Sequence, residues 1–358
     1  GALYVGQTRG LTAVAVDVNG DTLAGGIAWT SSDPGRAAVD AQGRVTGQGA
    51  GTATITASRD GKAASTSVTV LPRPTPAWNQ TAEWSTTGGN PRHDGYVAAT
   101  LDPGVFQRRW EKQFGATLQL QPVATGAGQV YVLAGAFNAS TLRLSALSAA
   151  DGAERWGRTF TGSFFSAPAS GNGRVYIAYG VHNEGGRLVS MDAADGAVRF
   201  TASYFQQLST SSPVVDGGAV YVGGGSGSVH RADALTGAWT WQKVLGGNDE
   251  LIPAVGGGRV VVFRGSTYNT PSGVVSLNAA TGAEMGVVSS SVAVPRQTPV
   301  LGGAGSVIGA DGSNLLSVPL QAGAPAWSAG GFFPRLPVAG NGVVYAVRMR
   351  EVAAYRES

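Results

Sequence analysis

The chain contains no cysteine in its 358 residues, and only 13 % of them are charged. Disulfides, thiolate metal sites and cysteine nucleophiles are therefore excluded. Lys and Arg are scattered and form no basic stripe, so we predict no nucleic-acid partner. No apolar run approaches the roughly 18–20 residues that cross a bilayer, and we predict no transmembrane segment. A signal-peptide pattern is also missing, while Gly1–Tyr4 reads as part of a strand, so we expect a further segment upstream.

Residues with catalytic or metal-binding chemistry are scarce. The three histidines, His93, His182 and His230, lie far apart and lack the spacing of metal ligands. No nucleophile elbow, calcium loop, phosphate loop or paired carboxylates can be found. The sequence thus predicts no catalytic residue, no cofactor and no metal, and a protein that is not an enzyme.

Glycine, in contrast, is abundant, with 55 residues placed between short apolar runs. This arrangement is typical of short strands joined by tight turns, because glycine adopts the positive φ that such turns require. We therefore predict an all-β protein.

Residues 1–71 read as six or seven short strands around a central Trp29, which indicates a small β-sandwich. The runs 29–34 (WTSSDP), 43–47 (GRVTG) and 51–55 (GTATI) resemble group 2 bacterial Ig-like domains. The resemblance implies a spacer or adhesive module, found on exported and surface proteins, without catalytic residues. Residues 72–79 are expected to form an extended linker, because proline occupies every second position from Pro72 to Pro76.

A repeat of 38–46 residues fills the second part of the chain, 80–358, and matches the length of a four-stranded propeller blade. Each unit opens at a proline, followed seven or eight residues later by a β-branched strand. These prolines are Pro122, Pro168, Pro213, Pro253, Pro299 and Pro337.

An aromatic residue four positions after a turn glycine marks the fourth strand of four units, as in Gly152 with Trp156. The last unit stops before this strand, whereas residues 107–114, which contain Trp110, precede the first unit. We therefore predict a six-bladed propeller closed by this N-terminal strand, with seven blades as the alternative if residues 77–100 form another.

The units resemble the repeat of pyrroloquinoline-quinone-type propellers, with a pattern such as Arg231-x-Asp233-x3-Gly237-x3-Trp241. Members of that family are quinone-dependent dehydrogenases or non-catalytic scaffolds, such as the outer-membrane assembly lipoprotein. The dehydrogenases resemble longer, eight-bladed rings with a vicinal cysteine pair and a calcium site. This chain has no cysteine, and the resemblance therefore implies the scaffold group.

Aromatic and polar residues gather in the loops that connect fourth to first strands and second to third strands. These loops share one face of a propeller, and such side chains favour interface cores and sugar platforms. The candidate partner-binding residues are Phe164, Phe165, Tyr204, Phe205, Gln206, Arg296, Phe332, Phe333, Arg335, His182 and Tyr268. For Phe165 and Phe333 the alternative is a side chain that points inward and plugs the ring. His182, a lone loop histidine, has the alternative of a simply solvated side chain.

The resulting functional hypothesis is an exported, non-catalytic scaffold whose propeller face docks a protein partner, in the setting of a membrane complex. One alternative is a cell-surface adhesin or glycan-binding module. The other is a quinone-dependent or lyase-type enzyme. The expected location is the periplasm or the cell surface.

Overall fold

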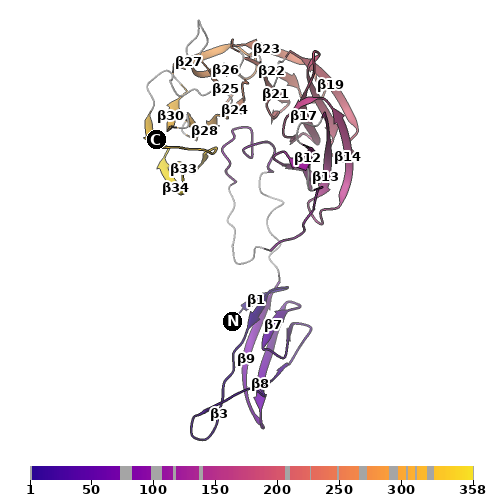
Figure 1. Ribbon diagram of the computed structural model, residues 1–358, viewed down its shortest axis with the longest axis vertical. Helices are drawn as coiled ribbons and strands as arrows, with labels where there is room; N and C mark the ends of the chain where they lie inside the picture. The colour runs from indigo at the N-terminus through magenta and orange to yellow at the C-terminus, as the bar shows by residue number, and fades with distance from the viewer. Residues whose placement is uncertain are drawn as a thin grey trace. The chain divides into compact units, whose positions relative to one another are not determined.

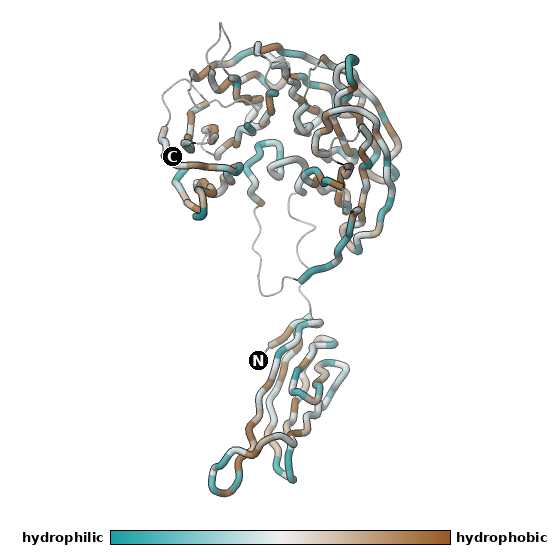
Figure 2. Tube along the Cα trace, in the orientation of Figure 1, coloured by the Kyte–Doolittle hydropathy of each residue, from teal (hydrophilic) through white to brown (hydrophobic). Residues whose placement is uncertain are grey.

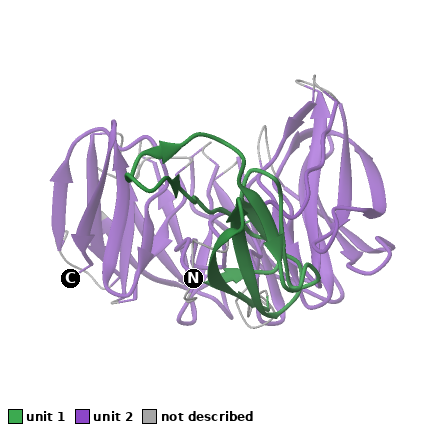
Figure 3. Cartoon of the chain, turned by 90° about the horizontal axis from the view of Figure 1, so that it is seen from below, with its two compact units in different colours: residues 1–81, 100–107 green, residues 82–99, 108–358 purple. Residues whose placement is uncertain are grey.

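The computed structural model describes residues 2–72, 83–97, 107–115, 118–136, 140–205, 210–225, 227–247, 250–265, 272–289, 297–303, 305–310, 313–320 and 326–357. In these ranges all regular elements are strands, so the all-β prediction is confirmed. The chain forms two compact units, residues 1–81 with 100–107, and residues 82–99 with 108–358 (Figure 3). Within the described ranges no helix is long and apolar enough to span a membrane.

The first unit is the predicted small sandwich. One sheet has the order β1-β9-β8-β5, a second has the order β2-β7-β6, and β3 and β4 form a separate hairpin. The strands are β1 Ala2–Tyr4, β2 Thr8–Gly10, β3 Ala15–Val16, β4 Thr22–Leu23, β5 Ala28–Ser31, β6 Ala37–Val39, β7 Arg44–Gly47, β8 Gly51–Arg59 and β9 Lys62–Leu71. Its core contains Leu3, Val45, Ile55 and Val70, with Trp29 packed against it. Trp29 therefore has the core position that its place in the predicted strand suggested.

Among its described residues the second unit has six antiparallel sheets, one for each predicted blade, which follow one another in an arc (Figure 1). Blade 1 is β10 Leu118–Leu120, β11 Ala124–Gly126, β12 Gln129–Ala136, β13 Thr141–Ser148 and β14 Glu154–Thr161; blade 2 is β15 Ser163–Phe165, β16 Ala169–Gly171, β17 Arg174–Val181, β18 Gly185–Asp192 and β19 Val198–Tyr204. Blade 3 is β20 Val214–Asp216, β21 Ala219–Gly224, β22 Ser228–Asp233 and β23 Trp239–Val244; blade 4 is β24 Ala254–Gly256, β25 Arg259–Arg264, β26 Gly273–Asn278 and β27 Glu284–Ser289. Blade 5 is β28 Val300–Leu301, β29 Ser306–Ala310, β30 Asn314–Pro319 and β31 Trp327–Gly330; blade 6 is β32 Val338–Gly340, β33 Val343–Arg348 and β34 Glu351–Arg356.

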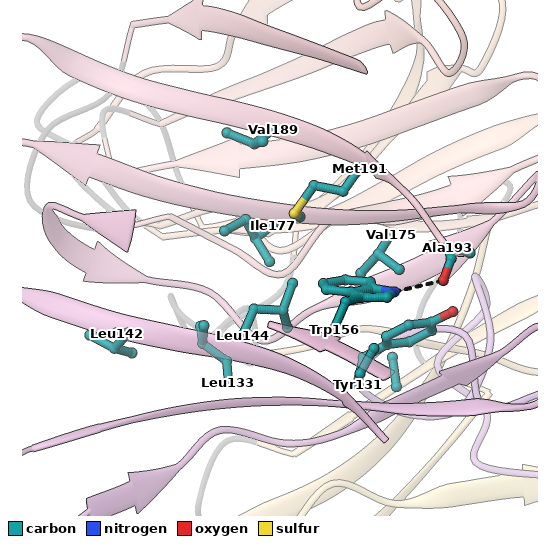
Figure 4. Packing of buried hydrophobic residues seen from close by; sticks show 12 residues of the cluster. Tyr131, Leu133, Leu142, Leu144, Trp156, Val175, Ile177, Val189, Met191 and Ala193 are labelled. Atoms are coloured by element: carbon teal, nitrogen blue, oxygen red, sulfur yellow. Dashed lines mark hydrogen bonds between the residues drawn. The ribbon is translucent and has the colours of Figure 1, made fainter. Parts of the chain in front are cut away.

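Apolar cores lie between successive blades, so the inner strands are largely apolar in Figure 2. The core between blades 1 and 2 contains Leu144, Trp156 and Ile177 (Figure 4). Trp156 donates its indole N–H to the Ala193 carbonyl of blade 2. The turn residue below the ring must be glycine, because a Cβ at Gly196, where φ is +69°, would lie 2.5 Å from Trp156. In blades 1 to 3 the Gly-x3-aromatic spacing thus reports how a blade packs on the next one.

The prediction that residues 107–114 form a strand that closes the ring is wrong for the residues that the structure describes. Residues 107–115 form no strand, and β34 is the outer edge of a three-stranded blade 6. Trp110 instead donates to the Ala149 carbonyl of blade 1 at 3.0 Å and lies over Gly152. It therefore makes the contact of a fourth-strand aromatic with the following blade, without the backbone pairing to β34 that the missing fourth strand of the last unit led us to expect.

A central strap, residues 84–96, connects all six blades and lies inside the arc (Figure 1). Carbonyl oxygens of the strap accept hydrogen bonds from backbone N–H groups on the inner strands of five blades, at 2.7–2.9 Å. The acceptor and donor residues are Trp84 and Thr125, Ser85 and Ser170, Pro91 and Val255, Arg92 and Leu301, and Asp94 and Ala339. The sixth link is to blade 3, where the buried Thr86 hydroxyl donates to the Pro213 carbonyl at 2.8 Å. Since each unpaired buried acceptor would cost about 1–3 kcal/mol, the strap and the inner strands stabilise one another.

Candidate functional site

A pocket of about 790 Å³ opens on the loop face of blades 2 and 3. It brings together four of the eleven residues predicted from the sequence, namely Phe164, His182, Tyr204 and Phe205. The loops meet because antiparallel strands place the β17–β18 hairpin at the same end of blade 2 as the end of β19, where Gly186 pairs with Tyr204. The rule that the two loop sets share a face is therefore confirmed in blade 2.

Phe164 is held in the pocket wall by a strained backbone. Its φ is +50°, a conformation that bulky residues rarely adopt. The pairing of β15 with β17 is shifted between Ser163 and Phe165, and such a bulge redirects the side chain that it contains. Phe164 is 49 % exposed as a result, whereas Phe165 turns inward and stacks on Tyr179 at 5.4 Å. Strain of this kind costs about 1–3 kcal/mol and is concentrated at functional sites.

Another part of the pocket lining is formed where β19 ends. Phe205 is 61 % exposed, but Tyr204 is buried, with its hydroxyl bonded to Thr210. Burial raises the pKa of Tyr204, so its hydroxyl remains protonated at neutral pH. Tyr204 is therefore a neutral, fixed wall, and Phe205 supplies the accessible ring.

Below Tyr204 lies a second buried layer. The His230 ring is 5.1 Å from Tyr204, and its Nε2 is 2.9 Å from the Ser228 hydroxyl. Burial lowers the pKa of His230 to about 4, so the imidazole is neutral above pH 5. This layer supports the pocket and does not line it.

Polar groups at the rim remain available to a ligand. The side chains of His182 and Asn183 make no hydrogen bond within the described residues, and Asn183 has φ of +61° in the hairpin turn. Glu184 is the pocket's charged lining residue and is paired with Arg187 at 2.8 Å. The pocket thus combines two exposed rings with the hydrogen-bonding side chains of His182 and Asn183, which suits a partly apolar ligand with polar groups at its edge.

The remaining predicted residues do not line this pocket. Phe332 is 53 % exposed between blades 5 and 6, and Arg335 is also exposed there. Phe333 is 3 % exposed and points inward, but it packs in the core between these blades, whereas its alternative was to plug the ring. Gln206, Tyr268 and Arg296 lie outside the described residues.

Gln242 is a lining residue that sequence reasoning missed. It lies on β23, next to the blade aromatic Trp241, and reaches the pocket from blade 3. Alternation along the strand predicts an outward side chain, but nothing in the sequence shows that a pocket from blade 2 adjoins it. Within the described residues no cluster of three metal-ligating side chains occurs.

The repeat region can now be compared with known families. Residues 93–329, well over half of the chain, match the family of the outer membrane protein assembly factor BamB. The chain belongs to this family. The predicted resemblance is thereby confirmed, and residues 21–61 also match the immunoglobulin-like domain of intimin.

A comparison with individual proteins gives a match to a short part of the chain. A 69-residue stretch is 46 % identical to an uncharacterized protein of Clostridium acetobutylicum. The match spans 19 % of this chain and 7 % of that protein, so the chain corresponds to a small part of this relative.

The chain is also similar to solved structures. The computationally designed Ika8 protein is 15 % identical, with 70 % of this chain and 75 % of that chain covered and a TM-score of 0.51. BamB from Moraxella catarrhalis is 19 % identical, with 66 % and 84 % covered and a TM-score of 0.49. A quinohemoprotein alcohol dehydrogenase from Pseudomonas putida HK5 is 12 % identical, with 77 % and 71 % covered and a TM-score of 0.45. The likeness to the Ika8 protein, at 15 % identity, describes the fold and leaves the activity open.

Proposed function

We propose that the chain is an exported, non-catalytic scaffold whose propeller holds a protein partner in the pocket of blades 2 and 3. The observation that carries this proposal is Phe164, a bulky ring kept half exposed at a positive φ in the same pocket as the exposed Phe205. A stable fold gains nothing from that conformation, whereas an interface gains a pre-positioned aromatic anchor.

Membership of the BamB family supports the wider setting. The family description refers to outer membrane protein assembly, and we propose a periplasmic or outer-membrane-associated location with a partner in a membrane complex. The Ig-like unit would act as a spacer or a second contact.

Site-specific photo-crosslinking tests the pocket. A benzophenone amino acid replaces Phe205 in the full chain, and a matched control replaces Leu235, which is 58 % exposed in the turn at the opposite end of blade 3. We expect one polypeptide to crosslink at position 205 and not at 235. This polypeptide is then purified, and its affinity is measured for the chain and for the Phe164→Gly/Phe205→Ala variant.

The pocket proposal requires that this double variant binds the polypeptide at least about tenfold more weakly, since each lost interface ring costs 1–2 kcal/mol or more. Equal affinity would refute it. Binding to a glycan array that the double variant abolishes, in the absence of a crosslinked polypeptide, would favour the glycan-binding alternative.

A further inference from the structure

An exposed surface outside the pocket lies on blade 6, at the hairpin between β33 and β34 and the loop before β32; we call it the tip. Eight residues other than glycine have positive φ in the described chain, and half of them are Asp or Asn, for which this is common. Met349, with φ of +52°, is one of the exceptions. It is 73 % exposed, so its side chain, like that of Phe164, projects into solvent from a strained backbone.

The hairpin containing Met349 contradicts ordinary turn chemistry. Arg348 pairs with Glu351, so β33 and β34 are joined by the two residues Met349 and Arg350. Two-residue hairpins with positive φ at the first position strongly favour glycine there. A methionine at this point is a departure from local preference of the kind expected at functional positions.

Phe332 extends the tip from the loop before β32. Met349 donates its backbone N–H to the Phe332 carbonyl at 3.2 Å, which places the hairpin beside this loop. Phe332 is 53 % exposed, and Leu336 in the same loop is 38 % exposed. Phenylalanine and the adaptable methionine are both enriched at protein interfaces.

The charge of the tip is positive. Residues 331–358 contain four arginines and two glutamates. One of the glutamates, Glu357, is only 3 % exposed and so adds little negative charge to the surface. Arg348 is paired with Glu351 at 3.3 Å. Arg335 and Arg350 are exposed and have no carboxylate within 4.0 Å among the described residues. Two uncompensated cations therefore flank two exposed apolar side chains.

We infer that this basic tip, formed by Phe332, Arg335, Met349 and Arg350, is a second docking surface, and that it binds an acidic, partly apolar segment of a protein. The two arginines complement the carboxylates, while Phe332 and Met349 receive the apolar side chains between them. An extended segment with alternating acidic and apolar residues fits both requirements.

Fluorescence anisotropy of the full chain with a labelled peptide of alternating glutamate and leucine tests this inference. The Arg335→Gln/Arg350→Gln variant should bind about tenfold more weakly. Arg9→Gln/Arg155→Gln removes two exposed charges elsewhere and is the matched control, with unchanged affinity. Added salt should weaken binding of the wild type and have less effect on the tip variant.

Met349→Gly separates binding from folding. Glycine suits the turn, so the thermal unfolding curve should be retained while the peptide affinity falls. Phe205→Ala, which alters the pocket of blades 2 and 3, should leave the peptide affinity unchanged, so the two proposals can fail independently.

Equal peptide affinity of the wild type and the Arg335→Gln/Arg350→Gln variant would overturn the inference. So would failure of the wild type to bind the peptide. Binding to phosphatidylglycerol vesicles through the same arginines, without peptide binding, would assign the tip to a membrane surface instead of a protein.

Discussion

The indole N–H of Trp156 donates a 2.8 Å hydrogen bond to the carbonyl oxygen of Ala193, which belongs to the next blade. The bond recurs in Trp110 with Ala149 and in Trp241 with Ala279, both at 3.0 Å. At these three junctions an indole ring covers a turn glycine and bonds to the backbone of the same turn, whereas Phe200 of blade 2 covers Gly237 without such a bond.

Two substitutions of Trp156 distinguish the contribution of ring packing to stability from that of the indole hydrogen bond. Trp156→Ala should lower the free energy of unfolding by about 3–5 kcal/mol, because it leaves a cavity between blades 1 and 2. Trp156→Phe should cost less, about 1–2 kcal/mol, since Gln129 still donates to the Ala193 carbonyl at 2.7 Å. Urea unfolding followed by circular dichroism measures both. Equal losses in the two variants would show that the ring's packing contributes little.

The blade pattern was predictable from the sequence because it is local. Proline, turn glycine and aromatic recur at fixed spacings that each blade needs for its own turns and for the contact with its neighbour. Closure of the ring was not predictable in the same way. The pattern identified Trp110 as a fourth-strand aromatic, correctly in its contact with Gly152, but backbone pairing with β34 depends on two segments more than 200 residues apart.

Only some of the residues that line the candidate pocket could be predicted from the sequence. Phe164, His182 and Phe205 could be chosen as loop residues with interface chemistry. The strain at Phe164 could not, because Ser163, Phe164 and Phe165 read as an ordinary β run and the bulge arises from pairing with β17. Gln242 was equally hidden, since the neighbouring blade creates the pocket around it.

Thr86 tests the central strap. Thr86→Val keeps the shape of the side chain and removes its hydrogen bond to the buried Pro213 carbonyl. The free energy of unfolding should fall by about 1–3 kcal/mol. Thr159→Val, at an exposed position of β14, is the control and should change it by less than about 0.5 kcal/mol. A Thr86→Val variant as stable as this control would show that the strap is dispensable at blade 3.

Two buried histidines predict that the propeller loses stability in mild acid. Burial lowers the pKa of both His93 and His230 to about 4, from 6.5 in an exposed chain. Between pH 6.5 and about 4 the unfolded chain therefore binds more protons than the folded one, and stability falls as the pH decreases. Each histidine contributes on the order of 3 kcal/mol across this window.

The measurement is the urea midpoint from pH 7.5 to 4. His93→Asn accepts the positive φ of +56° at this position, and with His230→Gln it should flatten the dependence on pH. His182→Gln, in the exposed hairpin turn, should retain the wild-type slope. An unchanged slope in the double variant would assign the acid sensitivity to other groups.

Phe164 and Phe165 should respond in opposite directions to the same substitution. Phe164→Gly relieves the strain at φ of +50° and removes a ring that is 49 % exposed, so the free energy of unfolding should stay constant or rise by up to about 1 kcal/mol. Phe165→Gly removes a ring stacked on Tyr179 in the core between blades 1 and 2, and should lower it by about 2–4 kcal/mol. Thermal and urea unfolding of both variants give the comparison. A marked loss of stability in Phe164→Gly would mean that its exposed ring supports the fold, and the reason for proposing it as a binding anchor would disappear.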